Sequence, residues 1–330
     1  MDSKQKKAGI VGSGNIGHCF AVMFASSGYQ VQMYDISDDR LKLGLDRCRH
    51  KLQQLQAEGL STSKDSVEVQ LSRISTTTDF NQMVQNTCYI QECVFEKPDL
   101  KRDVFERLDA ALPDDNTTTV LASSTSTLQP SLFTHGLKHK AQCIVVHPVF
   151  PPNYCSAVEV VPAPWTSKET QETTRKTLIE FGRKPVMFAR EVIGFGVNRL
   201  QYALIKEAYN LVASGILSVE DVDTLMSDGL GLRYALFGTL GTCAMTANGV
   251  GDFLHKFRDS IKRVCDDSGP TPDVLAQPAL DKIVNEMEKI VPASRIAELH
   301  AYRERGLAKI VKVKSEWEQD SPLLKPSGSQ

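Results

Sequence analysis

The sequence has no apolar run that approaches the length of a membrane-spanning helix, so a membrane-embedded protein is excluded from our predictions. Its first residues, MDSKQKK, are polar, and the apolar run behind them has only about four residues, which is typical of neither a signal peptide nor a transit peptide. The formal net charge is only −2 at pH 7, and nothing therefore favours nucleic acid or an anionic membrane as a partner. We expect a cytoplasmic protein.

Cysteine lacks the spacing of a disulfide framework or a zinc site. The eight cysteines are scattered and lie largely within apolar runs, which favours reduced, buried thiols. His135 and His139 stand four residues apart with no acidic residue between them, so we interpret them as part of a solvated helix end. We predict no bound metal.

Glycine is concentrated in residues 6–17, which read KKAGIVGSGNIG. An apolar run predicts a strand over residues 8–11, a helical pattern follows, and the glycines between them match the Gly-x-Gly-x-x-Gly fingerprint of a dinucleotide site. Gly12 permits a tight turn, Gly14 lets the backbone approach a pyrophosphate, and Gly17 lets the helix lie close to the strand. The segment predicted to bind the cofactor is Gly12, Ser13, Gly14, Asn15, Ile16 and Gly17.

A carboxylate follows at the expected distance. Asp35 ends the second predicted strand, residues 30–34, and lies 18 residues after Gly17. A carboxylate at this position can accept hydrogen bonds from both ribose hydroxyls and would repel a 2′-phosphate. We therefore predict NAD, and not NADP, as the cofactor.

The chain of 330 residues favours two domains. Strand and helix patterns alternate up to residue 192, which predicts an α/β, Rossmann-type, doubly wound and mainly parallel sheet. Further strands are expected at residues 88–94, 118–122, 142–146 and 158–161, and helices at residues 16–27, 37–59, 67–84 and 98–112.

Residues 193–318 show helical patterns without strands, so we predict an NAD-binding domain over 1–192 and a helical substrate and dimerisation domain over 193–318. Helices are expected at 194–214, 219–226, 253–265, 278–290 and 294–314. The first of these is apolar nearly all round, which predicts burial in the helical domain or in a homodimer interface. Residues 319–330 contain prolines, glycine and serines and are predicted to be a disordered tail.

Four polar features fall at the carboxyl ends of predicted strands: the Gly12 turn, Asp35, the hydroxyl cluster 123–127 and His147. Ligands bind at that edge of an open parallel sheet, so we expect one crevice there. Imidazole titrates near neutrality, which makes His147 the expected base that takes a hydroxyl proton as hydride leaves. Glu159, twelve residues later, would orient the imidazole ring as a dyad.

Two further side chains complete the candidate site. Ser126 would hydrogen-bond the substrate oxygen, and Asn198, in the first turn of the long helix, would reach back from the second domain. Spacing alone does not separate these catalytic roles from structural ones. A histidine that ends a strand is often structural, a serine-threonine run is often only a loop, and Glu159 can be a solvated strand residue.

Eight segments, in order through about two thirds of the chain, carry a family resemblance: GIVGSGNIG (9–17), MYDI (33–36), IQECVFE (90–96), SSTSTL (123–128), QCIVVHPVFPP (142–152), AVEVVP (157–162), GFGVNRLQYALIKEA (194–208) and DGLGLRYALFG (228–238). In them the chain resembles the 3-hydroxyacyl-CoA dehydrogenase superfamily. The resemblance implies the catalytic set Ser126, His147, Glu159 and Asn198. It also implies that Asp35 binds the adenosine ribose and that Glu96, Lys101 and Ser124 lie along the cofactor.

Within that superfamily the chain is similar to the gulonate dehydrogenase branch. The acyl-CoA enzymes usually carry a Pro-Met-Gly-Pro turn where this chain has GLRYA, and Arg233 in that turn would give a substrate carboxylate a planar, bidentate partner. A surface or interface salt bridge is the alternative. Phe150 replaces an active-site asparagine of the family, and Thr239 and Gly241 stand where the gulonate enzyme has proline and glutamate, so these positions leave the exact substrate open.

The predicted function is NAD-dependent oxidation of the 3-hydroxyl of a free hydroxy acid, with L-gulonate as the leading substrate. One alternative is the oxidation of a 3-hydroxyacyl-CoA thioester. The other is a non-enzymatic, crystallin-type protein that binds NADH. The intact catalytic set favours an enzyme, because a purely structural protein does not need it.

Overall fold

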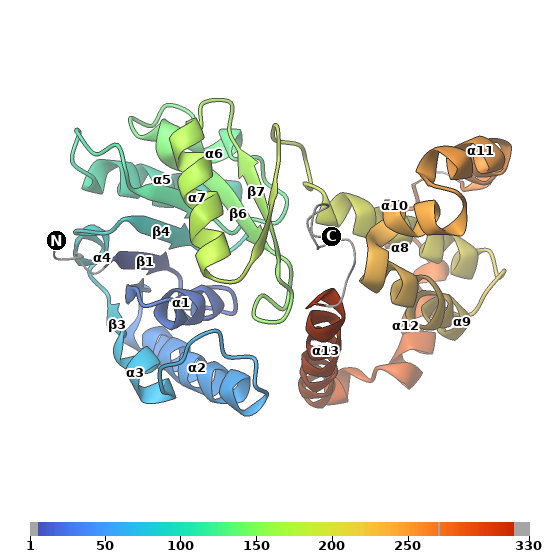
Figure 1. Cartoon of the computed structure of the whole chain (residues 1–330), viewed down its shortest axis with the longest axis horizontal. Coiled ribbons are helices and arrows are strands. Elements are labelled where there is room, and N and C mark those ends of the chain that lie inside the picture. Colours follow the sequence, from blue (N-terminus) through green and yellow to red (C-terminus); the bar gives the residue numbers. More distant parts are fainter. Residues whose placement is uncertain (1–5, 270, 320–330) are drawn as a thin grey trace, which may run out of the picture. The chain divides into compact units, whose positions relative to one another are not determined.

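The computed structural model describes residues 6–269 and 271–319. The chain divides into two compact units, Met1–Asn198 and Arg199–Gln330. The first unit is a sheet flanked by helices, and the described part of the second unit is helical (Figure 1). Eight strands form the sheet in the order β3-β2-β1-β4-β5-β6-β7-β8. The predicted fold class, a doubly wound and mainly parallel sheet followed by a helical region, is confirmed.

The bounds of the elements are as follows. The strands are β1 (Lys7–Val11), β2 (Gln30–Tyr34), β3 (Ile74–Thr77), β4 (Tyr89–Glu92), β5 (Val120–Ser123), β6 (Cys143–Pro148), β7 (Ala157–Pro162) and β8 (Lys184–Met187). The helices of the first unit are α1 (Gly17–Ser26), α2 (Asp38–Ala57), α3 (Val67–Ser72), α4 (Phe80–Val84), α5 (Pro98–Ala111), α6 (Ser131–Thr134), η1 (Lys140–Gln142) and α7 (Lys168–Glu180). Helix α8 (Val197–Ala213) begins in the first unit and continues into the second, which holds α9 (Val219–Thr224), η2 (Leu225–Leu230), α10 (Gly231–Thr246), α11 (Val250–Asp267), α12 (Ala279–Ile290), η3 (Ala293–Arg295) and α13 (Ile296–Gln319).

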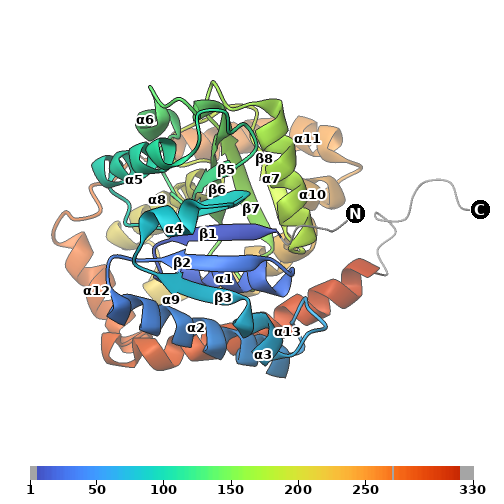
Figure 2. The same cartoon turned by 90° about the vertical axis from the view of Figure 1, so that its left-hand side faces the viewer.

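Helices cover both faces of the sheet. On one face α1 packs against α2 and α3, and Phe24 of α1 meets Phe181, just after α7, with ring centroids 4.7 Å apart. On the other face α5 packs against α4 and α6. Figure 2 shows α5 and α7 on opposite sides of the strands. Strands covered on both faces read as continuous apolar runs, which is why 8–11, 118–122 and 142–146 were recognisable as strands in the sequence.

The direction of β7 determines which residues meet at the candidate site. Strands β1 to β6 pair in parallel, whereas β7 runs antiparallel to β6. Its amino end therefore lies at the edge where the parallel strands have their carboxyl ends. In this register His147 of β6 lies opposite Glu159 of β7.

The helix predicted over residues 67–84 is wrong, because this segment folds as α3, the edge strand β3 and α4. Each helix has its own cap: Ser66 accepts from the Val69 N–H, and Asp79 accepts from the N–H groups of Asn81 and Gln82. Between them, the β-branched run that starts at Ile74 pairs with β2. Helix α7 and strand β8 were not predicted either; β8 is mostly exposed and lacks an apolar run.

The second unit contains the predicted helices α9, α11, α12 and α13, together with α10, which was not predicted. Helix α10 contains three glycines and bends at Gly238, whose φ is +66°, so its sequence does not read as one helix. None of the helices in the described ranges combines the length and apolar content of a transmembrane span. Gln319 ends α13, so the predicted tail is wrong at that residue, and its remainder, 320–330, lies outside the described residues.

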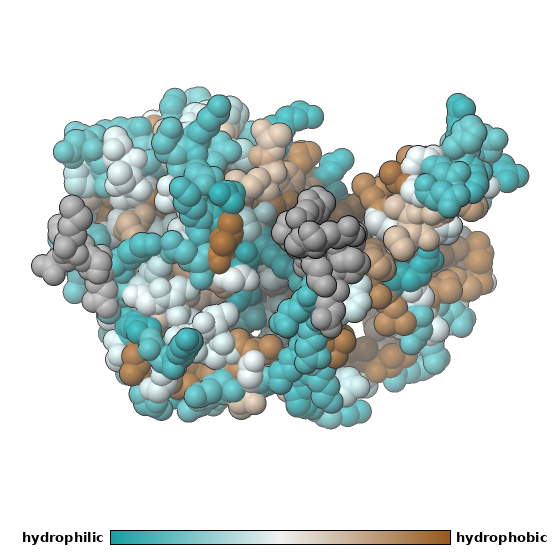
Figure 3. Space-filling view, in the orientation of Figure 1, coloured by the Kyte–Doolittle hydropathy of each residue, from teal (hydrophilic) through white to brown (hydrophobic). Residues whose placement is uncertain are grey.

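Apolar side chains are exposed on the second unit. Figure 3 shows brown, apolar surface over it. On α8, Leu200 is 68% exposed and Leu204 is 45% exposed, although the sequence predicted a helix that is covered on all sides. Apolar side chains of α8 are therefore left exposed to solvent in the described part of the chain.

Candidate active site

The glycines of the loop after β1 are required by close backbone approaches. Gly12 has a φ of +99°, and a Cβ there would lie 2.9 Å from the Cys93 carbonyl oxygen. A Cβ at Gly17 would lie 1.8 Å from the Gly12 carbonyl oxygen, a separation that no side chain tolerates. The absence of side chains at Gly12 and Gly17 consequently lets the start of α1 pack directly against the loop after β1.

Gly14 has a different environment, because no atom other than its chain neighbours lies within 4 Å of the position of a Cβ. The backbone at Gly14 is therefore open to a ligand, next to the start of α1. Asn15 beside it is exposed and Ile16 is half-buried. This geometry fits the pyrophosphate of a dinucleotide, which favours accessible backbone at the start of a helix.

Asp35 is held in place by the same loop. Its Oδ2 accepts hydrogen bonds from the Ser13 N–H at 2.9 Å and the Ser13 hydroxyl at 2.8 Å, and its Oδ1 accepts from the Ile36 N–H at 2.8 Å. The Arg40 guanidinium lies 3.7 Å from Oδ1. Ser13 is 2% exposed, so its side chain serves to orient Asp35. Asp35 retains lone pairs that can accept from ribose hydroxyls.

A buried ion pair lies behind the next strand end. Lys101 Nζ is 2.9 Å from Glu92 Oε1, and both side chains are essentially inaccessible. Glu92 also accepts from the Ser123 hydroxyl at 2.5 Å and the Val94 N–H at 2.6 Å. Both charges are therefore paired and hydrogen-bonded, as burial of charge requires. Glu92 was missed in the sequence; its signal was an acid at the end of a strand with a lysine nine residues later.

Lys101, Glu96 and Ser124 were expected along the cofactor. Lys101 instead points its ammonium group into the buried pair, and Ser124 donates its hydroxyl to the Glu92 carbonyl at 2.9 Å. Glu96 faces residues 125–127 of the loop after β5. Contact of these three residues with the cofactor stays a prediction.

His147 and Glu159 form the expected pair. His147 Nδ1 lies 2.8 Å from Glu159 Oε2, and Glu159 is 2% exposed. An ionised carboxylate only accepts hydrogen bonds, so Nδ1 carries the proton and Nε2 presents its lone pair. Within the described residues His147 Nε2 has no hydrogen-bond partner, and the imidazole packs on the ring of Phe195, with centroids 6.0 Å apart. The ring is thus oriented as a general base.

Glu159 also holds the start of α8. Its Oε1 accepts from the N–H groups of Gly196 at 2.7 Å and Val197 at 2.8 Å. Burial alone would raise the pKa of the Glu159 carboxyl, but the hydrogen bonds from His147 and from these two N–H groups outweigh burial and lower it. The carboxylate is consequently ionised and is stabilised by the helix N-terminus.

Asn198 is brought to Ser126. Its Nδ2 donates to the Ser126 carbonyl at 2.7 Å, and Asn198 is the last residue of the first unit. Phe195, which sequence reasoning missed, is fully buried with a φ of +48°. Its left-handed backbone turns the chain so that Gly196 and Val197 face Glu159, and a buried non-glycine residue in that region is a marker of a functional site.

Arg233 lies on α10 in the second unit. Its side chain is exposed, and its Nη2 donates to the Thr246 hydroxyl at 3.1 Å. Among the described residues Arg233 has no acidic partner, so a surface salt bridge within them does not account for it, and an interface salt bridge stays the alternative. Its contact with substrate stays a prediction, as does any effect of Phe150, which is 53% exposed, or of Thr239 and Gly241.

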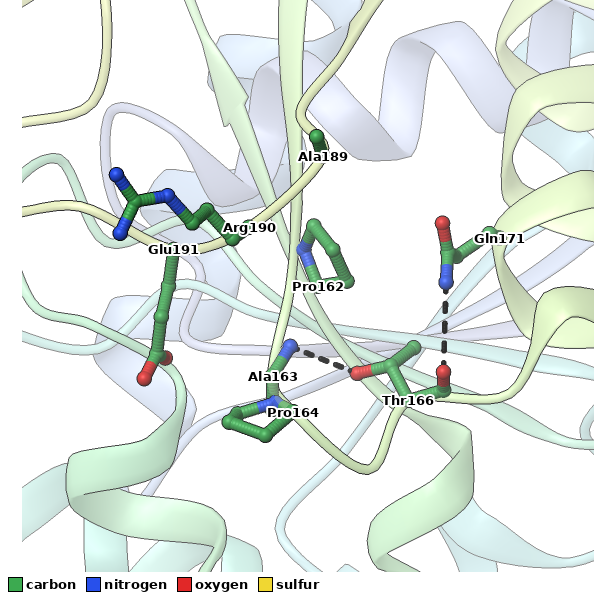
Figure 4. A pocket seen from close by; sticks show the side chains of 8 residues that line it. All are labelled: Pro162, Ala163, Pro164, Thr166, Gln171, Ala189, Arg190 and Glu191. Carbon is green, nitrogen blue, oxygen red and sulfur yellow. Dashed lines mark hydrogen bonds between the residues drawn. The ribbon is translucent and has the colours of Figure 1, made fainter.

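A cavity of about 240 Å³ lies elsewhere on the first unit. Figure 4 shows Arg190 and Glu191 on one side of it and Gln171 on the other. It borders Pro162, which pairs with Ile144 at the amino end of β6, so it is at the sheet edge opposite the catalytic pair. No cluster of three His, Cys, Asp or Glu side chains suited to a metal exists in the part of the chain described here.

The sequence matches two family models in succession. The NAD-binding domain of 3-hydroxyacyl-CoA dehydrogenase matches residues 7–192, and the C-terminal domain of 3-hydroxyacyl-CoA dehydrogenase matches residues 194–286. The chain belongs to the 3-hydroxyacyl-CoA dehydrogenase family. It is an NAD-dependent oxidoreductase of that family.

Individual proteins also resemble the chain over most of its length. The chain is 41% identical to lambda-crystallin of Oryctolagus cuniculus, over 92% of this chain and 95% of the relative. It is 32% identical to L-carnitine dehydrogenase of Streptomyces coelicolor, over 93% of this chain and 94% of the relative. The solved NAD+-dependent 5-formyl-3-hydroxy-2-methylpyridine 4-carboxylic acid 5-dehydrogenase shares the fold, with a TM-score of 0.80 at 24% identity, over 94% of this chain and 99% of that chain.

Proposed function

We propose that this protein oxidises the 3-hydroxyl of a free hydroxy acid, and that L-gulonate, giving 3-dehydro-L-gulonate, is its substrate. The observation that carries the proposal is the His147–Glu159 pair, in which Nδ1 is bound to a buried carboxylate and Nε2 is left as the base. NAD+, when bound, accepts the hydride from the carbon that carries the hydroxyl. The protein's part is to remove the proton and to orient the alcohol.

In this reaction His147 Nε2 takes the hydroxyl proton and becomes an imidazolium, which Glu159 stabilises across the 2.8 Å contact. The C–H bond breaks with its electron pair leaving as hydride, and the C–O bond becomes a carbonyl. Ser126 and Asn198 lie together and are the groups that would hydrogen-bond the oxygen as its charge develops.

The substrate class rests on the charge of Arg233 and on the relatives. A free acid presents a carboxylate two carbons from the reacting carbon, whereas an acyl-CoA presents a neutral thioester there. Arg233 offers a planar cation whose observed partner is a neutral hydroxyl. L-carnitine, named for one relative, is itself a free 3-hydroxy acid, and lambda-crystallin is a closer match to the chain.

A second candidate is the oxidation of 3-hydroxyacyl-CoA, which the family's name favours. One assay separates the candidates: NADH formation with NAD+ and, in turn, L-gulonate, L-carnitine and 3-hydroxybutyryl-CoA. We expect the highest kcat/KM with L-gulonate. A higher value with 3-hydroxybutyryl-CoA would reject the free-acid proposal, and no turnover with any of the three would favour an NADH-binding protein without this activity.

A further inference from the structure

Glu96 is surrounded by hydrogen-bond donors from the loop that carries Ser126. Its Oε1 lies 2.6 Å from Thr125 Oγ1, 2.9 Å from the Ser126 N–H and 3.1 Å from the Thr127 N–H. The hydroxyls of Ser126 and Thr127 each lie 3.2 Å from the same oxygen. One carboxylate oxygen therefore gathers three consecutive residues after β5.

The carboxylate is ionised and is fixed from its other side. Its Oε2 lies 3.5 Å from Lys101 Nζ, which the buried pair with Glu92 holds in place. Burial alone would raise the pKa of the Glu96 carboxyl, but the Thr125 hydroxyl, the Lys101 charge and the loop N–H groups outweigh burial and lower it. Glu96 is thus a negative charge set between a fixed cation and a loop.

The five donors cannot all bind strongly at once, because one carboxylate oxygen has about two lone pairs. The shortest contact, from Thr125, and the two N–H contacts hold the loop itself. The Ser126 hydroxyl, at 3.2 Å, is among the most weakly held donors. It can rotate to another acceptor while the rest of the loop stays bound.

The opposite side of Ser126 is held as well. Asn198 Nδ2 donates to the Ser126 carbonyl at 2.7 Å. The backbone of Ser126 is therefore clamped between Glu96 on its N–H and Asn198 on its C=O, and its hydroxyl remains adjustable. This combination suits a side chain that must donate to a substrate oxygen at a defined point in space.

We propose that Glu96 is a positioning residue that clamps residues 125–127 and presents the Ser126 hydroxyl to the substrate oxygen. The inference rests on the proposed function, in which Ser126 binds that oxygen. It assigns to Glu96 a role through Ser126, in addition to the contact with the cofactor that the family resemblance implies.

The test compares Glu96→Ala, Glu96→Gln and Ser126→Ala with the full-length wild type. We expect Glu96→Ala to lower kcat/KM for the hydroxy acid, measured at saturating NAD+, about tenfold to a hundredfold, the range for a misplaced reacting group. Glu96→Gln keeps an acceptor oxygen and should recover part of the loss. In the Ser126→Ala background, Glu96→Ala should cost little more, because both changes remove the same interaction.

Amide hydrogen exchange of residues 123–128 gives a readout that needs no turnover. Exchange should quicken in Glu96→Ala, less so in Glu96→Gln, and stay at the wild-type rate in Ser126→Ala. The matched control is Glu191→Gln. The Glu191 carboxylate accepts the Ser131 N–H at 3.0 Å and does not contact the catalytic pair. This variant should leave both kcat/KM and loop exchange unchanged.

Three results would overturn the inference alone. The first is wild-type loop exchange in Glu96→Ala, and in Glu96→Gln if the alanine variant does not fold. The second is a weakened Kd for NADH with normal kcat, which confines the role of Glu96 to the cofactor. The third is additivity of the Glu96 and Ser126 effects; the proposed function survives all three. Normal turnover of Ser126→Ala instead removes Ser126 from the proposed mechanism, and the inference with it.

Discussion

Glu159 joins His147 to Val197: Oε2 lies 2.8 Å from the imidazole Nδ1, and Oε1 accepts the Val197 N–H at 2.8 Å. The same carboxylate thus orients the candidate base and caps the first turn of α8. Both contacts are stronger to an ionised acceptor, and both therefore favour the carboxyl staying ionised while buried. The orientation of the base and the start of the helix that connects the two units therefore depend on one side chain.

The first prediction concerns the dyad. His147→Gln should lower kcat roughly a hundredfold or more, which is the usual contribution of a positioned general base. Glu159→Gln should lower kcat comparably, because an amide N–H facing Nδ1 would favour the tautomer with its proton on Nε2. NADH affinity, measured by fluorescence titration, should barely change in either variant. Near-normal turnover in both would show that the pair is structural.

The second prediction concerns stability at low pH. The pKa of Glu159 is lowered in the fold from its ordinary value of 4.5, so its contribution to stability is complete above that value. The contribution is lost as the pH falls through the folded-state pKa. The difference in free energy of unfolding between wild type and Glu159→Gln, from urea titrations, should therefore be largest near neutrality and shrink below the ordinary value. A difference that grows on acidification would contradict the lowered pKa.

The third prediction concerns cofactor choice. Asp35 would face the 2′ position of the adenosine ribose, so the wild type should strongly prefer NAD+ over NADP+. Asp35→Ala should weaken NADH binding and narrow that preference. Ser13→Ala removes the 2.8 Å hydroxyl contact that orients Asp35 and should give a smaller effect in the same direction. Equal use of both cofactors by the wild type would refute the role of Asp35.

The fourth prediction concerns substrate charge. Loss of a charge-assisted hydrogen bond costs on the order of 1.5–3 kcal/mol, so Arg233→Met should raise the KM for a sugar acid about tenfold to a hundredfold. Arg233→Lys should show a smaller rise in KM than Arg233→Met, since lysine keeps the positive charge but lacks the bidentate geometry of the guanidinium. Thr246→Val removes the observed partner of Arg233 but no charge, and serves as the matched control with a smaller effect. An unchanged KM in Arg233→Met would exclude Arg233 as the carboxylate partner.

The fifth prediction concerns assembly. Helix α8 exposes Leu200 and Leu204, and an apolar face of this kind favours cover by a second subunit. We expect a homodimer joined largely through the C-terminal unit. Light scattering at micromolar concentration should give twice the chain mass, and Leu200→Glu with Leu204→Glu should shift it toward the mass of one chain. A monomeric wild type would reject the prediction.

The amino-acid sequence by itself determined the dinucleotide loop, because its signals are local. Gly12 adopts a φ of +99° and Gly17 lies directly against the Gly12 carbonyl, both within one strand-turn-helix unit, and Asp35 follows at the end of the next strand. The alternation of apolar runs and helical periods likewise predicted the parallel sheet, since strands covered on both faces must be apolar throughout. Where the local pattern was weak, as over residues 67–84, a strand was mistaken for helix.

Only the tertiary structure decided what the polar residues contact. His147 meets Glu159 because β7 runs antiparallel to β6 in a register that no local pattern specifies. Glu96 reaches the Ser126 loop because β4 and β5 are neighbouring strands, and Asn198 reaches Ser126 from 72 residues away at the start of α8. The Lys101 side chain points inward because its ammonium group pairs with the buried Glu92 carboxylate. Such contacts depend on which elements become neighbours in space, and a residue's type and spacing do not contain that information.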